Sequence, residues 1–312
     1  MLLRLRGVAV AVALSLLPMV GLAQEQRLGF EVDAKVIYMT REAPPSQSIL
    51  SEFGFAPTPD LQNASSIDPG YEPGFRIRLH ADVTQYFGVE ASGTFLSKFS
   101  DSITSDNGLI NAAEPAVAFA ATSVDTEWES TFSAQQVNAT YKIFEGVQGF
   151  AGLRRNAIDE TLSMGFPGAP GVSISQRVDN RLVGPQIGLR VNARPLVGEA
   201  MGPFDIGLEL AGGVLFSTIS ASGTGTGGIA DTAIDSNETT YFAQAGIEAG
   251  FEIQPGFILS VGYQALWIGD ILHVTEQFGT TNVLATATPT TLAQTDDILY
   301  HGGQLKLTLV ID

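Results

Sequence analysis

The stretch GFRIRLHADVTQYFGVEASGTFL, residues 74–96, alternates apolar and polar side chains on both sides of a short turn near 83–84. Alternation of this kind predicts β-strands, because successive side chains of a strand point to opposite faces. One face of the first strand is charged, with Arg76, Arg78, His80 and Asp82. That face could meet water around a soluble β-sandwich, or it could line the lumen of a membrane barrel. The alternation alone does not distinguish these two folds.

The composition narrows the class of protein. The chain has 312 residues, a pI near 4.4, only 16% charged residues and no cysteine. A strongly acidic chain with so few charges is neither a typical disordered acidic protein nor a basic nucleic-acid binder. We therefore expect no nucleic-acid partner. Since disulfides are absent, stability has to come from a closed hydrogen-bond network or from a large core.

The first residues have the pattern of a secretory signal peptide. Two arginines precede an apolar run over 7–17, and small residues follow up to Ala23. We expect cleavage after Ala23, which leaves 24–312 as the exported domain. A retained membrane anchor is disfavoured, because the apolar run is shorter than the roughly 20 residues that a spanning helix needs.

The rest of the chain shows no long 3.6-residue apolar period and is predicted to be all-β. The alternation predicts ten strands, near 29–39, 72–82, 85–97, 128–144, 147–159, 176–193, 204–217, 238–253, 256–268 and 298–311. The short connections are 83–84, 145–146, 194–203 and 254–255. The long connections are 40–71, 98–127, 160–175, 218–237 and 269–297.

Long and short connections thus alternate along the chain. This alternation is typical of an outer-membrane barrel, which has short periplasmic turns and long extracellular loops. A Greek-key sandwich gives no reason for it. We therefore expect a single antiparallel up-and-down transmembrane β-barrel of about ten strands, with eight to twelve as the range.

Aromatic residues provide a second indication. Barrels carry aromatic girdles at both membrane interfaces, and two girdle residues on one strand are separated by an even number of positions. The pairs that fit are Phe30 and Tyr38, Phe87 and Phe95, Phe204 and Phe216, Tyr241 and Phe251, and Phe257 and Trp267. We expect these side chains at the lipid interface.

The opposite face of the predicted strands carries charges of both signs. The residues expected to line the lumen are Arg76, Arg78, His80, Glu90, Lys142, Arg154, Arg190, Glu209, Glu248, Glu252 and Lys306. In a narrow barrel these charges should pair across the interior, because an isolated charge is costly in a dry environment. The pairs would also set any ion preference.

Two neighbouring segments carry a more specific motif. Phe150, Gly152, Leu153 and Arg154 are followed by Asp159 and Glu160; the next strand has Asn180, Gly184, Pro185, Gly188 and Leu189. This pattern resembles the Legionella-type major outer membrane protein family of pore-forming β-barrels. The resemblance covers about a quarter of the chain closely and implies a barrel of about ten strands with porin-like activity. The C-terminus departs from many such barrels, since the chain ends in Ile311 and Asp312 without a terminal aromatic residue.

These observations predict a protein of the Gram-negative outer membrane that is not an enzyme. It would act as a small porin-like pore or as a structural surface protein with long acidic extracellular loops. Outer-membrane lipid and the barrel-assembly machinery are the expected partners, and we expect no cofactor and no metal site. One alternative is a hydrolase at the outer rim, with His273 or His301 acting with Asp296 or Asp297. Another is a soluble secreted β-sandwich adhesin.

Overall fold

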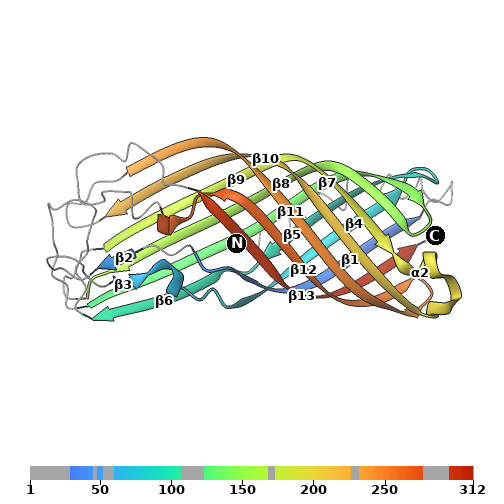
Figure 1. The fold of residues 1–312 in the computed structure, drawn as a ribbon, viewed down its shortest axis with the longest axis horizontal. Coiled ribbons are helices and arrows are strands. Elements are labelled where there is room, and N and C mark those ends of the chain that lie inside the picture. The colour runs from blue at the N-terminus through green and yellow to red at the C-terminus, as the bar shows by residue number, and fades with distance from the viewer. Residues whose placement is uncertain are drawn as a thin grey trace.

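The computed structural model describes residues 29–44, 48–51, 60–106, 123–167, 173–225, 232–276 and 295–311. Eleven strands of this part of the chain form one antiparallel sheet that closes on itself as a barrel (Figure 1). Strands β5 and β6 both pair with β7 and occupy one place in the wall, so the barrel has ten wall positions. The prediction of a ten-stranded antiparallel barrel is confirmed, and the soluble sandwich alternative is wrong.

The wall strands run in chain order around the barrel. Their bounds are β1 (Phe30–Arg41), β4 (Tyr71–Asp82), β5 (Phe87–Leu96), β6 (Phe99–Asp106), β7 (Ser123–Phe144), β8 (Val147–Gly165), β9 (Ser173–Asn192), β10 (Phe204–Gly225), β11 (Thr232–Gln254), β12 (Phe257–Ile271) and β13 (Asp296–Ile311). The first and last strands pair with each other, from Phe30 opposite Ile311 to Arg41 opposite Tyr300. This pairing closes the sheet between its first and last strands, as a membrane barrel requires.

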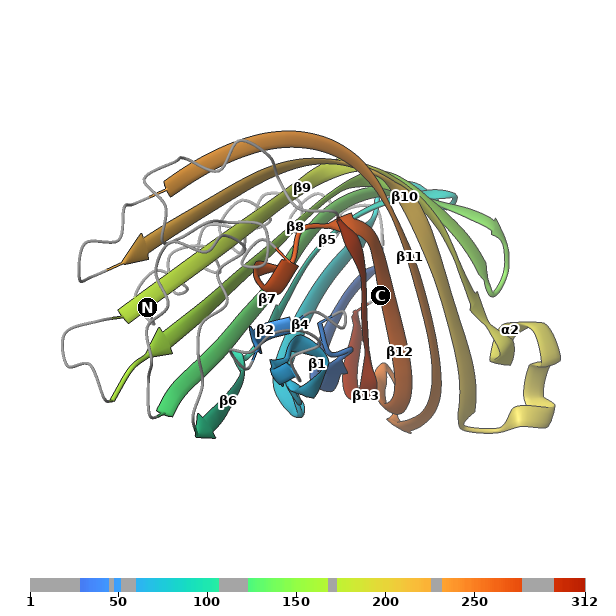
Figure 2. The same ribbon diagram turned by 60° about the vertical axis from the view of Figure 1, so that its left-hand side comes forward.

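The two ends of the barrel differ. At one end the connections are short, and Gly146 and Gly256 adopt positive φ angles of 82° and 78° that allow tight turns at 145–146 and 255–256. The short helices α2 (Ala193–Val197) and η2 (Gly198–Met201) lie at this end, between β9 and β10 (Figure 2). At the opposite end lie β6 and the small separate sheet of β2 (Ser48–Ser51) and β3 (Asp60–Asn63), followed by η1 (Ala64–Ser66) (Figure 1).

Five strands extend much further toward the long-loop end than the sequence suggested. Most of the predicted loops 160–175 and 218–237 continue β8, β9, β10 and β11, and the predicted loop 98–127 contains β6 and the beginning of β7. These stretches are rich in Ser, Thr, Gly and Asp, and of these Gly and Asp are depleted in strands. Pairing with a neighbouring strand overrides that local preference.

The length of the strands shows that the barrel projects beyond a membrane. Strand β10 has 22 residues. At about 3.3 Å per residue and a tilt of about 40°, it covers roughly 55 Å along the barrel axis, about twice the apolar band of such barrels. On β10 the interface aromatic residue nearer the long-loop end is Phe216. We call the part of β7 to β11 that lies beyond such residues, toward the long-loop end, the extension.

The outer face carries an apolar belt in the half nearer the short turns. Exposed Val36, Leu208, Ile247 and Leu307 lie on it, among other aliphatic residues. All ten predicted interface aromatics project from the outer side of their strands; Phe30, Phe95 and Phe257 are partly covered by neighbours, whereas Phe216 is 62% exposed. Exposed aliphatic side chains on this scale are costly in water and favourable in lipid. No helix of the described residues is long and apolar enough to cross a membrane.

In the extension the polarity of the two faces is reversed. Along β10, Leu208 and Phe216 face outward in the belt, whereas Thr218 faces outward beyond it and Ile219 is fully buried inside. The interior of the extension is an apolar core, formed in large part by Trp128, Phe132, Ile158, Leu162, Met164, Val178, Leu182, Leu215, Ile219 and Tyr300. The barrel therefore has a lipid-facing half with a polar lumen and a water-facing half with an apolar interior.

Candidate functional site

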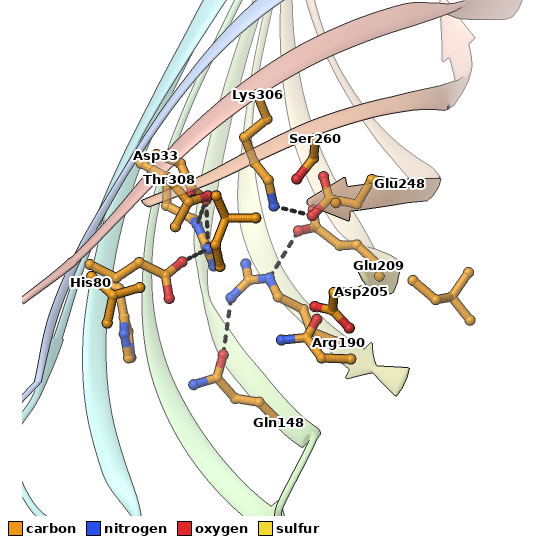
Figure 3. A pocket seen from close by; sticks show the side chains of 18 of the residues that line it. Asp33, His80, Gln148, Arg190, Asp205, Glu209, Glu248, Ser260, Lys306 and Thr308 are labelled. Carbon is orange, nitrogen blue, oxygen red and sulfur yellow. Dashed lines mark hydrogen bonds and ion pairs between the residues drawn. The ribbon is translucent and has the colours of Figure 1, made fainter. Parts of the chain in front are cut away.

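The lumen on the short-turn side contains a charged cavity of about 450 Å³ (Figure 3). Residues from all ten wall positions line it, including Glu31, Arg78, Arg190, Glu248 and Lys306. The lining continues to the turn at 145–146 and to α2, so the cavity opens at the short-turn end. We refer to it as the charged cavity.

Arg190 is the central cation of this cavity. Its Nη1 and Nη2 atoms donate to the two carboxylate oxygens of Glu90 at 2.6 and 2.8 Å, and its Nε donates to Glu209 at 2.9 Å (Figure 3 shows the bond to Glu209). Its guanidinium carbon Cζ lies 4.5 Å from the ring centroid of Phe150. A forked contact of this kind fixes both partners more firmly than a single bond between point charges.

Two further ion-pair groups complete the network. Arg78 donates from Nε to Asp33 at 2.6 Å, pairs with Glu31, and lies 3.5 Å from Glu90. The Glu248 carboxylate accepts from Lys306 and lies 3.5 Å from Lys35 Nζ. The lumen charges thus neutralise one another across the barrel, which lowers the cost of placing them inside a membrane protein.

All of the predicted lumen residues project inward, but several have partners that the sequence did not indicate. Arg154 is buried among neutral partners, donating to Asn156 and Gln244. Glu252 pairs with Arg194 near the turns, and Lys142 lies at the wall of the charged cavity. His80 Nε2 lies 3.1 Å from the hydroxyl of Thr140 and 3.7 Å from Asp82, close to the short-turn end.

A second polar cluster lies in the apolar core, and the sequence did not predict it. Arg41 Nη1 donates to Ser130 at 2.6 Å and to Glu160 Oε1 at 2.5 Å, and both charged side chains are fully buried. The Arg41 guanidinium also lies 4.8 Å from the ring centroid of Trp128. His273 Nδ1 is 3.2 Å from Arg41 Nη2 and 3.5 Å from Glu160 Oε1.

This buried cluster of Arg41, Glu160 and His273, which we call the Glu160 cluster, binds a segment that folds back into the lumen. Residues 271–276, which we call the plug segment, begin at the last residue of β12 and enter the apolar core, where Leu272 and Val274 are completely buried. The side chain of Asn180 donates to the Leu272 carbonyl at 2.9 Å and accepts from its amide at 3.2 Å. Glu160 Oε2 accepts from the Val274 amide at 2.9 Å. At the end of the segment, burial raises the pKa of Glu276 to about 7.

The rim-hydrolase hypothesis is not supported by the positions of its residues. His273 contacts the backbone oxygen of Asp297 at 3.4 Å, and its carboxylate neighbour is Glu160. His301 lies outside the lumen, with Nδ1 2.5 Å from the Tyr263 hydroxyl. The Asp297 carboxylate accepts from Trp267 and from the amide of Asp270. The two histidines therefore share no site, and neither forms the proposed pair with Asp296 or Asp297.

Comparisons with known proteins agree with this geometry at the level of the fold. The chain matches no family profile and no curated protein sequence. Among solved structures, the outer membrane protease OmpT from Escherichia coli matches with a TM-score of 0.51 and 10% sequence identity, covering 91% of this chain and 96% of that chain. The fold is that of an outer-membrane β-barrel. The translocator domain of the autotransporter NalP from Neisseria meningitidis matches with a TM-score of 0.43 and 10% identity, covering 90% and 88%.

The comparison with OmpT corrects one expectation from the sequence. We expected that the chain is not an enzyme, but a solved structure that shares its fold is a protease. A barrel of this fold is therefore compatible with enzymatic activity, and membership of the fold says nothing against it. At 10% identity the likeness concerns the fold alone.

Two signals in the sequence could have revealed the interior of the extension. In the predicted strand 128–144, Trp128 and Phe132 occupy even positions, whereas Val137 and Tyr141 occupy odd positions. The apolar residues thus change faces within one strand. The second signal is the apolar run ILHV at 271–274 inside a predicted loop. An apolar run in a connection indicates a segment that is buried rather than solvated.

Proposed function

We propose that the protein is a surface-displayed barrel of the outer membrane that is closed in its resting state. The apolar belt would lie in lipid, and the long-loop end with the extension would face the outside of the cell, because outer-membrane barrels carry their long loops there. The charged cavity would then open to the periplasm. Lipid and the barrel-assembly machinery are the partners that this placement implies.

The observation that carries this proposal is the filled interior of the extension. Buried side chains from β7 to β13 pack against one another there. The plug segment adds Leu272 and Val274 to the same core, and η1 adds Ala64. Protein interiors packed in this way leave few voids larger than a water molecule. Of the two functions suggested by the sequence, a porin-like pore and a structural surface protein, the filled interior favours the second. An open pore would require the core to rearrange.

Three further predictions from the sequence belong to the same proposal. A cleaved signal peptide over residues 1–23, outside the described residues, would direct export. The barrel domain would occupy 24–312. The resemblance to the Legionella-type major outer membrane protein family stays a prediction. The resemblance also implies porin-like activity, and the filled interior disfavours that activity.

Planar bilayers test whether the resting protein conducts. The purified, refolded full-length chain should leave the bilayer electrically tight, without discrete current steps, even at high protein loading, because the apolar core blocks the lumen. A porin of known conductance added to the same membrane is the control for insertion conditions. Reproducible single-channel steps from the native chain would overturn the closed-barrel proposal and restore the pore.

A further inference from the structure

Beyond the proposed function, the boundary between the charged cavity and the apolar core holds two buried arginines, Arg76 and Arg154, with few carboxylate contacts. Apart from the Arg194–Glu252 pair near the turns, five cations and five carboxylates are joined by ion pairs in the lumen; they are Lys35, Arg76, Arg78, Arg190 and Lys306 with Glu31, Asp33, Glu90, Glu209 and Glu248. Arg154 is a further buried cation. Among the described residues no carboxylate lies within ion-pair distance of it, although it is only 4% exposed.

Arg76 is the second unusual group at this boundary. Its side chain is 4% exposed, and its one ion-pair contact is a long one, 3.5 Å from Nη1 to Glu209. Its Nε and Nη2 atoms have no hydrogen-bond partner within the described part of the chain. Leaving buried donors of a charged group unsatisfied is costly, so such groups usually have an ion or water beside them.

The two arginines line the same small cavity. It has a volume of about 20 Å³, and Arg76, Arg154, Gln244 and Gln264 contribute to its wall together with apolar side chains such as Phe132. A cavity of this size holds about one water-sized particle, since roughly 10–15 Å³ suffices for a water. Hence a monatomic ion fits, whereas a phosphate or a carboxylate ligand does not.

The lining favours an anion over a water molecule. The amide oxygen of Gln244 is already used by Arg154 Nη1 at 2.7 Å, and its nitrogen donates to Glu209 at 3.1 Å. The Gln264 amide donates to the sulfur of Met39. Besides the two guanidinium groups, the cavity wall includes Thr94, Tyr300 and apolar side chains. A water would accept the guanidinium hydrogen bonds but would bring no counter-charge to Arg154.

An ion can reach this cavity from the short-turn side. Arg76, Gln244 and Gln264 line both the small cavity and the charged cavity, which opens among the turns. We propose that a single halide ion, chloride under physiological conditions, binds between the guanidinium groups of Arg76 and Arg154. The ion gives Arg154 a counter-charge and satisfies the free donors of Arg76.

Bromide is the direct probe for this site. Crystals of the full-length, refolded chain equilibrated in sodium bromide should give an anomalous peak within hydrogen-bond distance of Arg76 and Arg154. An ordered water at that position with no anomalous signal at saturating bromide would overturn the proposal.

A stability measurement provides an independent test. The stability of the barrel is compared without chloride and at a chloride concentration ten times its dissociation constant, at the same ionic strength. For one site, the folding equilibrium constant should be about tenfold larger with chloride. Arg154→Gln should abolish this dependence, and the control Arg155→Gln, an exposed neighbour on the outer face, should retain it. Equal chloride dependence in the Arg154→Gln variant and the native chain would mean non-specific screening. If Arg154→Gln does not fold, the bromide experiment on the native chain decides.

Discussion

Replacing Glu160 with Gln should lower the free energy of unfolding by about 3–5 kcal/mol, because the variant leaves the fully buried Arg41 without its counter-charge. No other carboxylate among the described residues pairs with Arg41 in the apolar core. The measurement is urea unfolding of the refolded barrel in lipid vesicles, compared between variant and native chain.

Two companion variants make this prediction specific. Asp159→Asn changes the preceding residue, whose ion pair with Arg181 lies on the partly exposed outer face, and should cost less than about 1 kcal/mol. The double variant Arg41→Met with Glu160→Leu should recover most of the lost stability, because apolar side chains suit this core. A loss below about 1 kcal/mol for Glu160→Gln would show that the cluster is solvated.

Because the polarity of the two faces reverses along β10, three substitutions on this strand should change the free energy of unfolding by different amounts. Leu208→Arg places a charge in the lipid-facing belt and should cost about 2–4 kcal/mol. Thr218→Arg also faces outward but lies in the extension, and should cost little, since it is exposed to water there. Ile219→Ala removes a fully buried side chain and should cost about 2–5 kcal/mol.

The three β10 variants are compared by unfolding in vesicles and by folding yield. Equal costs for Leu208→Arg and Thr218→Arg would mean that the membrane covers the extension as well. In that case the boundary drawn at Phe216 would be wrong.

Much of the barrel could be predicted from the sequence because its lipid-facing half obeys one rule. Alternation placed the strands, and the aromatic pairs placed the belt between residues such as Phe204 and Phe216. Both signals are local, since a strand with lipid on one side and a polar lumen on the other shows its environment at every position.

The extension was not predicted because its environment differs from that of the belt. Where β10 leaves the bilayer, water replaces lipid outside, and apolar residues such as Leu215 and Ile219 turn to the interior. The apolar face of β10 therefore changes sides along the strand, so a single pattern of alternation does not describe the whole strand. Polar, small residues at outward positions such as Thr218 then resemble a loop.

The ion pairs and the plug segment depend on contacts between distant parts of the chain. The sequence grouped charges of both signs inside the barrel, but the choice of Lys35 and Lys306 as partners of Glu248 follows from strand register. Similarly, nothing near residues 271–276 indicates that Asn180 and Glu160 will bind their backbone. Such pairings become visible only when the barrel is closed.

The polar cavity in the lumen ends at a sealed apolar core, and thiol labelling can test whether water and ions pass from one to the other. The chain has no cysteine, so single substitutions give a clean background. Ser260 lines the charged cavity, Ser217 lies buried in the interior of the extension, and Thr218 beside it is exposed.

In lipid nanodiscs, where both ends of the barrel are accessible, a small charged methanethiosulfonate reagent should modify Ser260→Cys and Thr218→Cys. It should leave Ser217→Cys unmodified until the protein is unfolded, because the apolar core excludes water and ions. Modification of Ser217→Cys in the folded barrel at the rate of Thr218→Cys would show that the interior of the extension is an open, hydrated passage and not a sealed core.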